Sequence, residues 1–288
     1  MYPAPLAGGL KQHGYHLGQK IGEGNYSTVR LATHIGRDGK KKVWACKIVN
    51  LAKCSEEIRE KFFPRELQIM SGLEHPHLLS VHRVLRCNER IFIFLPYARR
   101  GDLFQYLNKY GPLKEAQAKE WFTQLLQAVH YLHSNGIVHR DVKCENLLIT
   151  GDGKLLLGDF GFAKQCWCAS GARRHWSETF CGSAAYAAPE VITGQRYDPV
   201  VADLWSMGIV LFMMLNGVLP FGETNMKRLL KLQTERRYCF EPLLPRAPSA
   251  AAKSTIDQLL HPDPEQRIRM GALMQLSWVA GSPRVQTK

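Results

Sequence analysis

Residues 139–146 read His139-Arg140-Asp141-Val142-Lys143-Cys144-Glu145-Asn146, and residues 159–161 read Asp159-Phe160-Gly161. The first segment places a carboxylate (Asp141), a cation (Lys143) and an amide (Asn146) on one tight loop. Asp159 is expected at the end of a neighbouring strand. Asn146 and Asp159 offer the oxygen ligands that Mg²⁺ prefers, Asp141 can act as a base, and Lys143 can neutralise charge. The pattern therefore predicts one site that combines metal ligands, a base and a cation.

A glycine pair lies in Gly22-Glu23-Gly24-Asn25-Tyr26-Ser27-Thr28-Val29, between two expected strands. Glycine lets the backbone approach a ligand closely, so that its amides can meet phosphate oxygens. By itself such a segment is more often only a hairpin turn. A dinucleotide-binding motif is excluded because position 27 is Ser and a strand follows instead of a helix, and no Walker A pattern is present.

Lys47 lies on an expected strand among apolar neighbours. It can therefore face a cleft, where an ammonium holds phosphate as a point charge, although a solvated surface lysine is the usual interpretation. Glu66, on the helix that follows, is available as its acidic partner. A solvated glutamate is the alternative.

The first hundred residues are predicted to be rich in strands. Apolar or β-branched runs indicate strands at residues 16–21, 28–34, 41–50, 78–86 and 90–97. Gly36-Arg37-Asp38-Gly39 is typical of a hairpin turn. A helix is expected from Ser55, with an interruption at Pro64. The strands would form a small antiparallel sheet that packs on this helix.

Helices are predicted to dominate after Gly101. One helical face is formed by Ala118, Trp121, Phe122, Leu125, Val129 and Leu132. Asn135 and Gly136 would supply left-handed residues that end this helix. Two short strands are expected at 146–150 and 154–158, before an irregular stretch at 160–189 whose length is typical of a functional or a disordered segment. The change of period predicts an α+β architecture of two lobes with a cleft.

The chain has 288 residues, 45% of them apolar, and a formal net charge of +13. It can bury a large core, and its charge favours anionic partners. The longest apolar run, Met207–Leu215, is shorter than the roughly 20 residues of a membrane-spanning helix and indicates a buried core helix. The N-terminus lacks the basic start of a secretory signal, and the scattered cysteines indicate reduced thiols. An intracellular, cytoplasmic location is expected, with the nucleus left open.

In order, these motifs resemble the eukaryotic protein kinase family. Further matches are Ala188-Pro189-Glu190, Asp203-Leu204-Trp205-Ser206-Met207-Gly208 and Arg267. The resemblance runs from about Tyr15 to Trp278. It implies a bilobal kinase fold at 15–278, with a small antiparallel-sheet N-lobe (about 15–96) that carries one main helix and a larger helical C-lobe (about 99–278). Residues 1–14 would be an N-terminal extension, and 279–288 a short tail without room for a calmodulin-responsive segment.

Two further sequence features indicate which branch of the protein kinase family the chain resembles. Lys143, two residues after Asp141, resembles serine/threonine kinases. The segments Lys61-Phe62-Phe63-Pro64-Arg65-Glu66-Leu67 and 179–190 are similar to the testis-specific serine/threonine kinase subfamily of the calmodulin-kinase-like branch. This resemblance implies a role in male germ-cell development and protein substrates with Ser or Thr acceptors, with an upstream kinase or a chaperone as possible partners. A monomer without nucleic-acid or membrane partners is expected.

The resemblance also implies phosphoryl transfer from ATP with Mg²⁺. Asp141 would align the substrate hydroxyl, Lys143 would offset charge, and Asn146 and Asp159 would bind Mg²⁺. Lys47 would hold the ATP phosphates and Glu66 would orient it. The remaining nucleotide-binding positions are Ile21, Gly22, Glu23, Gly24, Asn25, Tyr26, Ser27, Thr28, Val29, Ala45, Leu95, Pro96, Ala98 and Leu148. Pro96 departs from the family pattern, which usually has an acidic residue there.

Four further positions resemble family residues with structural or regulatory roles. Thr179 occupies a position that many members phosphorylate, where the phosphate would meet Arg140; an ordinary loop threonine is the alternative. Glu190 would pair with Arg267, and Asp203 would brace the backbone of the catalytic loop. Ser183 would form a hydrogen bond with that loop.

For several other sequence features, two interpretations remain. Glu145 and Asp102 occupy positions where basophilic kinases read substrate arginines, although Asp102 can equally be a helix N-cap. Cys166, Cys168 and His175 could form a partial zinc site, but solvent-facing thiols are favoured. Surface arginines (173, 174, 236 and 237) lack a nucleic-acid motif, so a solvated basic surface is the default. The functional alternative is a pseudokinase that binds nucleotide without transferring phosphate.

Overall fold

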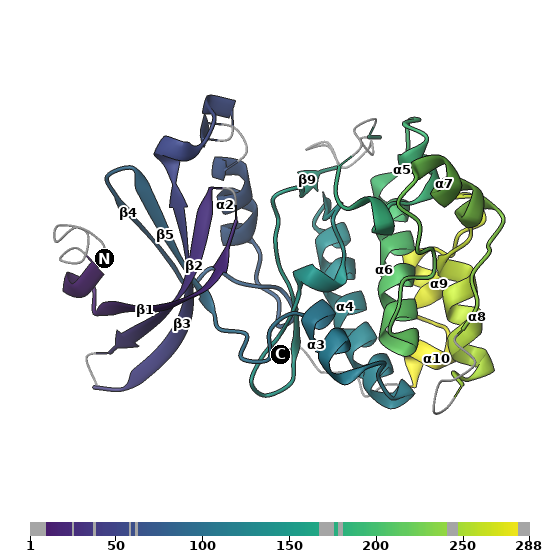
Figure 1. Ribbon diagram of the computed structural model, residues 1–288, viewed down its shortest axis with the longest axis horizontal. Helices are drawn as coiled ribbons and strands as arrows, with labels where there is room; N and C mark the ends of the chain where they lie inside the picture. Colours follow the sequence, from purple (N-terminus) through teal and green to yellow (C-terminus); the bar gives the residue numbers. More distant parts are fainter. Residues whose placement is uncertain are drawn as a thin grey trace. The chain divides into compact units, whose positions relative to one another are not determined.

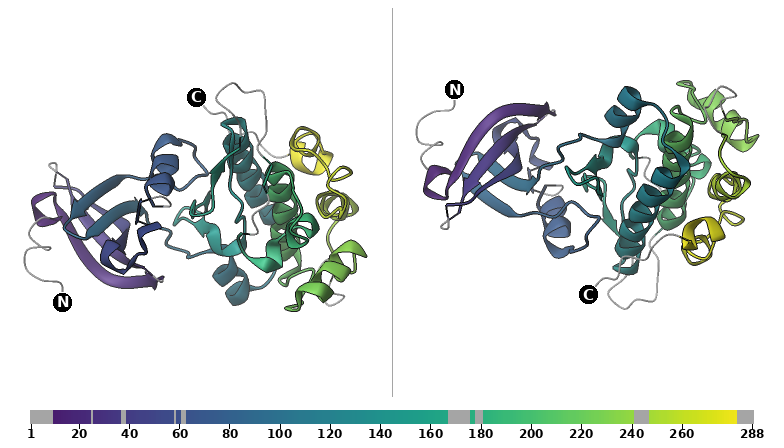
Figure 2. Two further views of the ribbon diagram at one scale, coloured as in Figure 1. Left: turned by 90° about the horizontal axis from the view of Figure 1, so that it is seen from above. Right: turned by 90° about the horizontal axis from the view of Figure 1, so that it is seen from below.

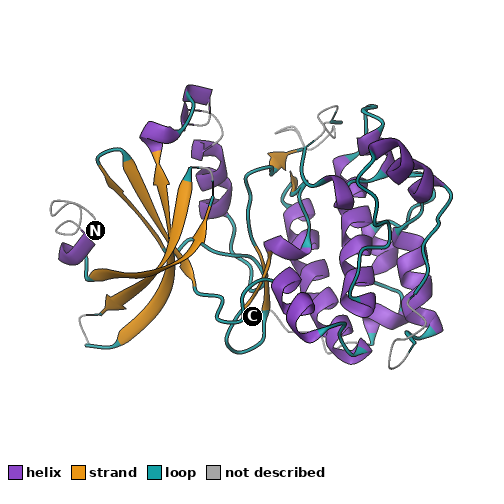
Figure 3. Ribbon diagram, viewed as in Figure 1, coloured by secondary structure: helices purple, strands orange, loops and turns teal. Residues whose placement is uncertain are grey.

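The computed structural model describes residues 10–24, 26–36, 39–57, 59–60, 63–166, 176–177, 181–240 and 247–281. The chain divides into two compact units. The N-terminal unit comprises Met1–Arg99 and Thr150–Asp152, and the C-terminal unit comprises Arg100–Ile149 and Gly153–Lys288. Strands dominate the first unit and helices the second (Figure 3), which confirms the predicted α+β class.

The N-terminal unit is built on an antiparallel sheet in the order β1-β2-β3-β5-β4 (Figure 1). Its described elements are β1 (Tyr15–Glu23), β2 (Ser27–Ile35), β3 (Lys41–Asn50), the 3-10 turn η1 (Leu51–Lys53), α2 (Phe63–Gly72), β4 (Arg83–Cys87) and β5 (Arg90–Pro96).

Both faces of this sheet carry apolar side chains. Partners in an antiparallel ladder lie on the same face, so Val29, Lys47 and Ile93 share one face. The opposite face carries a core of Leu10, Tyr15, Ala32, Trp44, Cys46, Ile48, Phe92 and Phe94. We call these the Lys47 face and the Trp44 face. Leu67 of α2 lines a cavity with Ile91, which belongs to the Lys47 face, so α2 lies on that side of the sheet beside Ile91.

The C-terminal unit is mainly helical. Its described elements are α3 (Leu103–Tyr110), α4 (Glu115–Ser134), β6 (Ile137–Val138), η3 (Cys144–Asn146), β7 (Leu147–Ile149), β8 (Leu155–Leu157), β9 (Lys164–Gln165), η4 (Ala184–Tyr186), α5 (Pro189–Ile192), α6 (Pro199–Asn216), α7 (Met226–Thr234), α8 (Ala250–Leu259), α9 (Met270–Leu273) and α10 (Ser277–Ala280). Strands pair as β6-β9 and β7-β8.

Helix α6 forms the centre of this unit and packs between α4 and α8 (Figures 1 and 2). It begins where Asp198 caps the amide of Val200, with Pro199 in the first turn, and it ends at Gly217 in the left-handed conformation. Its length and apolarity would also suit a membrane span, but 89% of it is buried within the chain. This burial confirms the prediction of a core helix at Met207–Leu215.

Several predicted boundaries were wrong. Strand β4 begins at Arg83 rather than at residue 78. Pro64 lies in the first turn of α2, which begins at Phe63 and where proline is tolerated. Only Gly136 is left-handed after α4, because Asn135 has φ −89°. Asn146 belongs to η3, so the strand expected from it begins at Leu147.

Candidate active site

The loop at residues 139–146 follows β6, includes η3 at its end, and is fixed by Asp203 of α6. The Asp203 carboxylate accepts hydrogen bonds from the backbone amides of His139 (3.0 Å) and Arg140 (2.9 Å). Arg140 has φ 64°, a conformation rare for a non-glycine residue, and these two bonds hold it there. The predicted role of Asp203 as a brace of the loop backbone is confirmed.

Asp203 is held as an anion within the core. Burial is the largest effect and opposes its ionisation, but the hydrogen bond and charge of His133, whose Nε2 lies 2.9 Å from Oδ2, favour it. The charge and backbone amide of His139 act in the same direction, and the pKa of Asp203 is lowered. The anion therefore accepts all three hydrogen bonds at neutral pH. His133 was not identified from sequence, because its contact with Asp203 joins two helices far apart along the chain.

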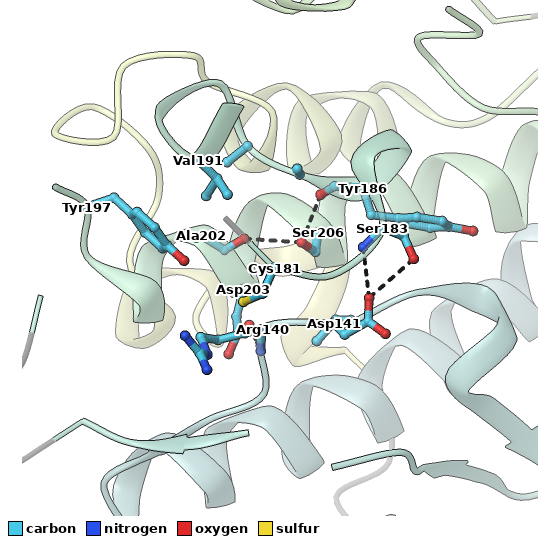
Figure 4. Close-up of a pocket in the computed structure, with 13 residues that line it drawn as sticks. Arg140, Asp141, Cys181, Ser183, Tyr186, Val191, Tyr197, Ala202, Asp203 and Ser206 are labelled. Carbon is cyan, nitrogen blue, oxygen red and sulfur yellow. Dashed lines mark hydrogen bonds between the residues drawn. The ribbon is translucent and has the colours of Figure 1, made fainter. Parts of the chain in front are cut away.

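Asp141 lies at the centre of the loop's polar contacts and is buried. Its Oδ2 accepts from Lys143 Nζ (2.8 Å) and from Asn146 Nδ2 (3.0 Å). Its Oδ1 accepts from the backbone amide of Ser183 at 3.0 Å (Figure 4). Lys143 also donates to Ser183 Oγ (2.8 Å). The structure thus brings three predicted site residues together and confirms that Ser183 bonds to this loop.

Gly182 allows the segment at Ser183 to approach the loop. It has φ 86°, and a Cβ at this position would lie 2.6 Å from the carbonyl oxygen of Arg140. Only glycine fits both constraints. The segment then packs around a cavity of about 20 Å³, lined in part by Asp141, Cys181 and Tyr186 (Figure 4). Gly182 lies within the 179–190 segment, and its backbone conformation explains why glycine is needed there.

Asp159 is positioned by the end of β8. The amide of Gly158 donates to the carbonyl of Asn146 (2.9 Å), and His139 Nε2 lies 3.0 Å from the carbonyl of Gly158. These contacts hold the start of the Asp159 segment beside the catalytic loop. Asp159 itself has φ 58° and an exposed side chain. The buried ring of Phe160 packs 5.4 Å from that of His139.

The donor set fits a magnesium ion. Asn146 Nδ2 donates to both the carboxylate and the carbonyl of Asp141, which leaves the amide oxygen of Asn146 as a ligand. Asp159 Oδ1 accepts only a long bond, 3.4 Å, from Gly161 N among the described contacts. An amide oxygen and a carboxylate on adjoining segments are hard oxygen ligands of the kind that Mg²⁺ binds.

Arg140 also contacts the segment after Asp159. Its Nε donates to the carbonyl of Phe162 (2.8 Å), and Nη1 lies 3.4 Å from Ser177 Oγ. The backbone of Ser177 pairs in turn with that of Tyr197. The guanidinium therefore contacts two stretches of this segment, one at Phe162 and one at Ser177. Thr179 lies outside the described residues.

The suggested zinc site gains no support. Cys168 and His175 lie outside the described residues, and the described part of the chain contains no cluster of three metal-binding side chains. Cys166 is buried and donates its thiol to the carbonyl of Gly136 (3.1 Å), so the prediction of a solvent-facing thiol was wrong for this residue. Each described cysteine is a free thiol, as expected.

Glu190 and Arg267 form the predicted ion pair. Arg267 Nη1 donates to Glu190 Oε1 (2.6 Å) and Nη2 to Oε2 (2.9 Å), while the Arg267 side chain is 0% exposed. The guanidinium further donates to the carbonyls of Val201 (3.0 Å) and His261 (3.0 Å). The pair ties α5, just after the Ser183 segment, to the loop before α9.

The two candidate acidic substrate contacts differ. Asp102 caps α3, because its Oδ1 accepts from the amide of Gln105 (2.8 Å), and this confirms the N-cap interpretation. Glu145 is exposed, and its carboxylate accepts from the buried Tyr186 hydroxyl (3.0 Å). Burial raises the pKa of Tyr186, so the hydroxyl stays a donor. Tyr186 was not predicted to have this role.

The remaining nucleotide-binding candidates lie mainly in the N-terminal unit. Gly24 and Ser27 form a tight turn with a 2.8 Å backbone bond, and Gly22 pairs with Val29; Asn25 lies outside the described residues. Of the others, Ile21, Glu23 and Tyr26 are exposed, Thr28 and Lys47 are half-buried, and Ala45 is buried. Glu66 lies within α2, but its side chain is outside the described part of the structure.

The three remaining candidates of this unit lie on or just after β5. Leu95 is buried opposite Ala45, Pro96 pairs with Trp44, and Ala98 follows in the connecting segment. Leu148 belongs to β7 of the C-terminal unit and is half-buried. Leu95 and Ala45 share the Lys47 face, so the predicted adenine and phosphate contacts of this unit lie on one side of its sheet.

Comparison with known proteins gives consistent matches. Residues 15–279 match the family described as protein kinase domain. The chain is 37% identical to testis-specific serine/threonine-protein kinase 1 of Mus musculus, over 96% of this chain and 74% of that protein. It is 40% identical to testis-specific serine/threonine-protein kinase 3 of Mus musculus, over 93% of this chain and 96% of that protein. Serine/threonine-protein kinase SIK2 of Gallus gallus is 36% identical over 99% of this chain and 34% of that protein.

Proposed function

The chain belongs to the protein kinase family and is an ATP-dependent serine/threonine protein kinase, and we propose that Asp141 is its catalytic base. The observation that carries this assignment is the fixed Asp141 carboxylate. It is bound by Lys143, Asn146 and the amide of Ser183 at 2.8–3.0 Å. A carboxylate held in this way can accept the proton of a substrate Ser or Thr hydroxyl and align its oxygen for attack on the γ-phosphate.

Lys143 has a second role in this proposal. Its ammonium bridges Asp141 and Ser183, at 2.8 Å from each. It can offset the negative charge that develops on the transferred phosphoryl group while it holds the carboxylate in place. Mg²⁺ would be held by Asn146 and Asp159, and its contribution is to neutralise phosphate charge.

We propose that the N-terminal unit binds ATP, with the turn at residues 22–29 and Lys47 at the phosphates and with Ala45 and Leu95 at the adenine. The backbone hydrogen bond from the amide of Gly24 to the carbonyl of Ser27 closes a tight turn, a conformation that suits a loop that covers phosphates. Lys47, Ala45 and Leu95 lie on one face of the sheet. Helix α2 lies on that same side of the sheet beside Ile91, which supports Glu66 as the residue that orients Lys47. Pro96 lacks an amide donor but retains its carbonyl, which can accept from the adenine amino group.

The experiment that tests the function is phosphate transfer from labelled ATP to a peptide library containing Ser, Thr and Tyr acceptors. We expect Mg²⁺-dependent transfer to Ser and Thr peptides, and a loss of at least about tenfold in Lys47→Met, because the phosphates lose a fixed cation. Lys53→Met, which removes an exposed lysine of η1, is the matched control.

Other results would contradict parts of this account. Transfer only to tyrosine would overturn the acceptor assignment. Nucleotide binding with no transfer would indicate a pseudokinase, which no observation in the structure or the comparisons favours. Full activity of Lys47→Met would remove the proposed phosphate contact.

We further propose that phosphorylation of Thr179 activates the kinase. Arg140 of the catalytic loop contacts Ser177, two residues before Thr179, so a phosphate on Thr179 would be added to a segment that this guanidinium already contacts. Phosphatase treatment should lower the activity severalfold, and Thr179→Ala should show the lower activity without treatment. Thr224→Ala, an exposed threonine elsewhere, serves as the control. If phosphatase leaves activity unchanged, the switch is absent.

Substrate preference is proposed to depend on Glu145. Its carboxylate is exposed and oriented by Tyr186, so it can contact a basic substrate side chain, whereas Asp102 is occupied as a helix cap. The peptide library reports this preference directly. By similarity to the testis-specific relatives we propose a role in spermatogenesis and germ-cell differentiation, as a cytoplasmic and phosphorylated protein, with an upstream kinase or a chaperone as partner.

A further inference from the structure

A cluster of basic side chains lies on the Trp44 face of the N-terminal sheet, opposite the face that carries Lys47. His34 pairs with Lys42 across β2 and β3, two positions along from the Ala32–Trp44 pair, so both lie on the Trp44 face. Arg83 pairs with Phe94, a core residue of that face, across β4 and β5. The members, which we call the basic cluster, are His13, His34, Lys42, His82 and Arg83.

Ring contacts hold the basic cluster together. The imidazole of His82 stacks on the indole of Trp44, with ring centroids 3.8 Å apart and an interplanar angle of 5°. Lys42 Nζ lies 4.2 Å from the centroid of the Trp44 ring, and the His34 ring lies 4.5 Å from that of Tyr15. These contacts fix cationic and imidazole groups at defined positions on a rigid sheet.

The remaining contact is between two basic residues. Arg83 Nη2 lies 3.5 Å from His13 Nδ1. His82, Arg83, Lys42 and His13 are exposed, and His34 is half-buried. Throughout the described ranges, no carboxylate contacts any of the five side chains.

The pKa of His82 also reflects this excess of basic groups over carboxylates. Burial lowers its pKa first, and the neighbouring Lys42, His34 and Arg83 lower it further. These neighbours come from β3, β2 and β4, and His13 adds a further basic group beside Arg83. Each charged neighbour is basic, so the surface repels a further proton and would be stabilised by a bound anion.

We propose that the basic cluster docks an acidic, Asp- and Glu-rich segment of a partner protein. The arrangement matches carboxylates, since Arg83, Lys42 and the imidazoles are all donors to oxygen. A nucleic acid is less well matched, because single-stranded bases bind by stacking on exposed rings. Here the two large aromatic rings of the face are covered, since Trp44 is 6% exposed and Tyr15 is 1% exposed, which leaves the smaller imidazoles as the exposed rings.

The experiment measures the binding of a fluorescein-labelled, Glu-rich peptide to the full chain by anisotropy. The double variant Lys42→Glu/Arg83→Glu should weaken binding at least about tenfold, because two attractive charge pairs become repulsive. The matched control is Lys227→Glu/Arg228→Glu, which makes the same charge change at exposed positions of α7. Kinase activity on a short peptide should be unchanged in both double variants. Lys42 and Arg83 lie on the face opposite Lys47, and Lys227 and Arg228 are exposed residues of α7 with no assigned role in the site.

Further arms make each outcome decisive. A Gln-rich peptide of equal length should not bind. If labelled single-stranded DNA binds as tightly as the Glu-rich peptide, the proposal is overturned in favour of a general polyanion surface. Equal loss in the α7 control also overturns it. Should the double reversal fail to fold, Lys42→Gln/Arg83→Gln provides the same comparison.

The pH dependence supplies an independent readout. A bound carboxylate stabilises the charged imidazole, so the pKa of His82 rises on binding and a proton is taken up. Binding should therefore be tighter at about pH 6 than at about pH 8. His82→Gln should flatten this dependence. A flat profile in the unmodified protein would contradict the role of His82.

Discussion

Replacing Asp141 with Ala is expected to lower turnover by roughly a hundredfold to ten-thousandfold, the range for loss of a general acid or base. The reason is geometric as well as chemical. The carboxylate accepts hydrogen bonds from Lys143, Asn146 and Ser183, which hold it in one position. Alanine has no oxygen to take its place. The KM for ATP should change little, because Asp141 is assigned to the acceptor hydroxyl and not to the nucleotide.

The measurement is steady-state phosphate transfer to a Ser or Thr peptide, with turnover and KM determined separately. Asp141→Asn keeps the side-chain size and one oxygen, so it tests whether the loss follows from the missing charge instead of a collapsed loop. Glu120→Ala removes an exposed carboxylate of α4 and should retain full turnover. Full turnover in both Asp141 variants would remove this residue from the reaction.

The catalytic loop could be predicted from sequence because its chemistry is local. Asp141, Lys143 and Asn146 are five residues apart at most, and a loop of that length keeps them close in any compact fold. Asp203 lies more than sixty residues later along the chain, and only the resemblance to kinases indicated its contact. Lys47 and Glu66 were candidates from their sequence context, and their roles follow from the same resemblance. The structure adds that Lys47 shares a sheet face with Ala45 and Leu95 and that α2 lies beside Ile91 on that face.

Other features could not be predicted because they depend on packing between distant segments. Tyr186 reaches Glu145, and His133 reaches Asp203, through contacts between elements far apart in sequence. The start of β4 was placed too early for a related reason. Leu78 and Leu79 are buried, and an apolar run reports burial without showing whether the backbone pairs in a sheet.

The basic cluster illustrates the same limit. Its members come from residues 13 to 83, and none forms a recognisable motif. Only the sheet register places His34, Lys42 and Arg83 on one face. The net charge of the chain indicated anionic partners, but it could not show where on the molecule they would bind.

Replacing Glu190 with Ala is expected to destabilise the protein by about 3–5 kcal/mol, because it leaves the Arg267 guanidinium buried without its counter-charge. That guanidinium is 0% exposed and lies 5.0 Å from the centroid of the Trp205 ring, so its charge is poorly solvated once the carboxylate is removed. The melting temperature should fall by about 6–20 °C. Chemical denaturation of the full chain measures the change.

The matched control is Glu265→Ala, which removes the exposed pair between Glu265 and Arg269 (3.4 Å) and should cost less than about 1 kcal/mol. The double variant Glu190→Leu/Arg267→Leu separates burial from pairing. Since an apolar pair avoids desolvating two charges, it should recover much of the stability lost in Glu190→Ala. If Glu190→Ala is no more destabilising than Glu265→Ala, the buried pair does not stabilise the segment that carries Ser183, and the position of that segment over Asp141 must depend on Gly182 and its neighbours alone.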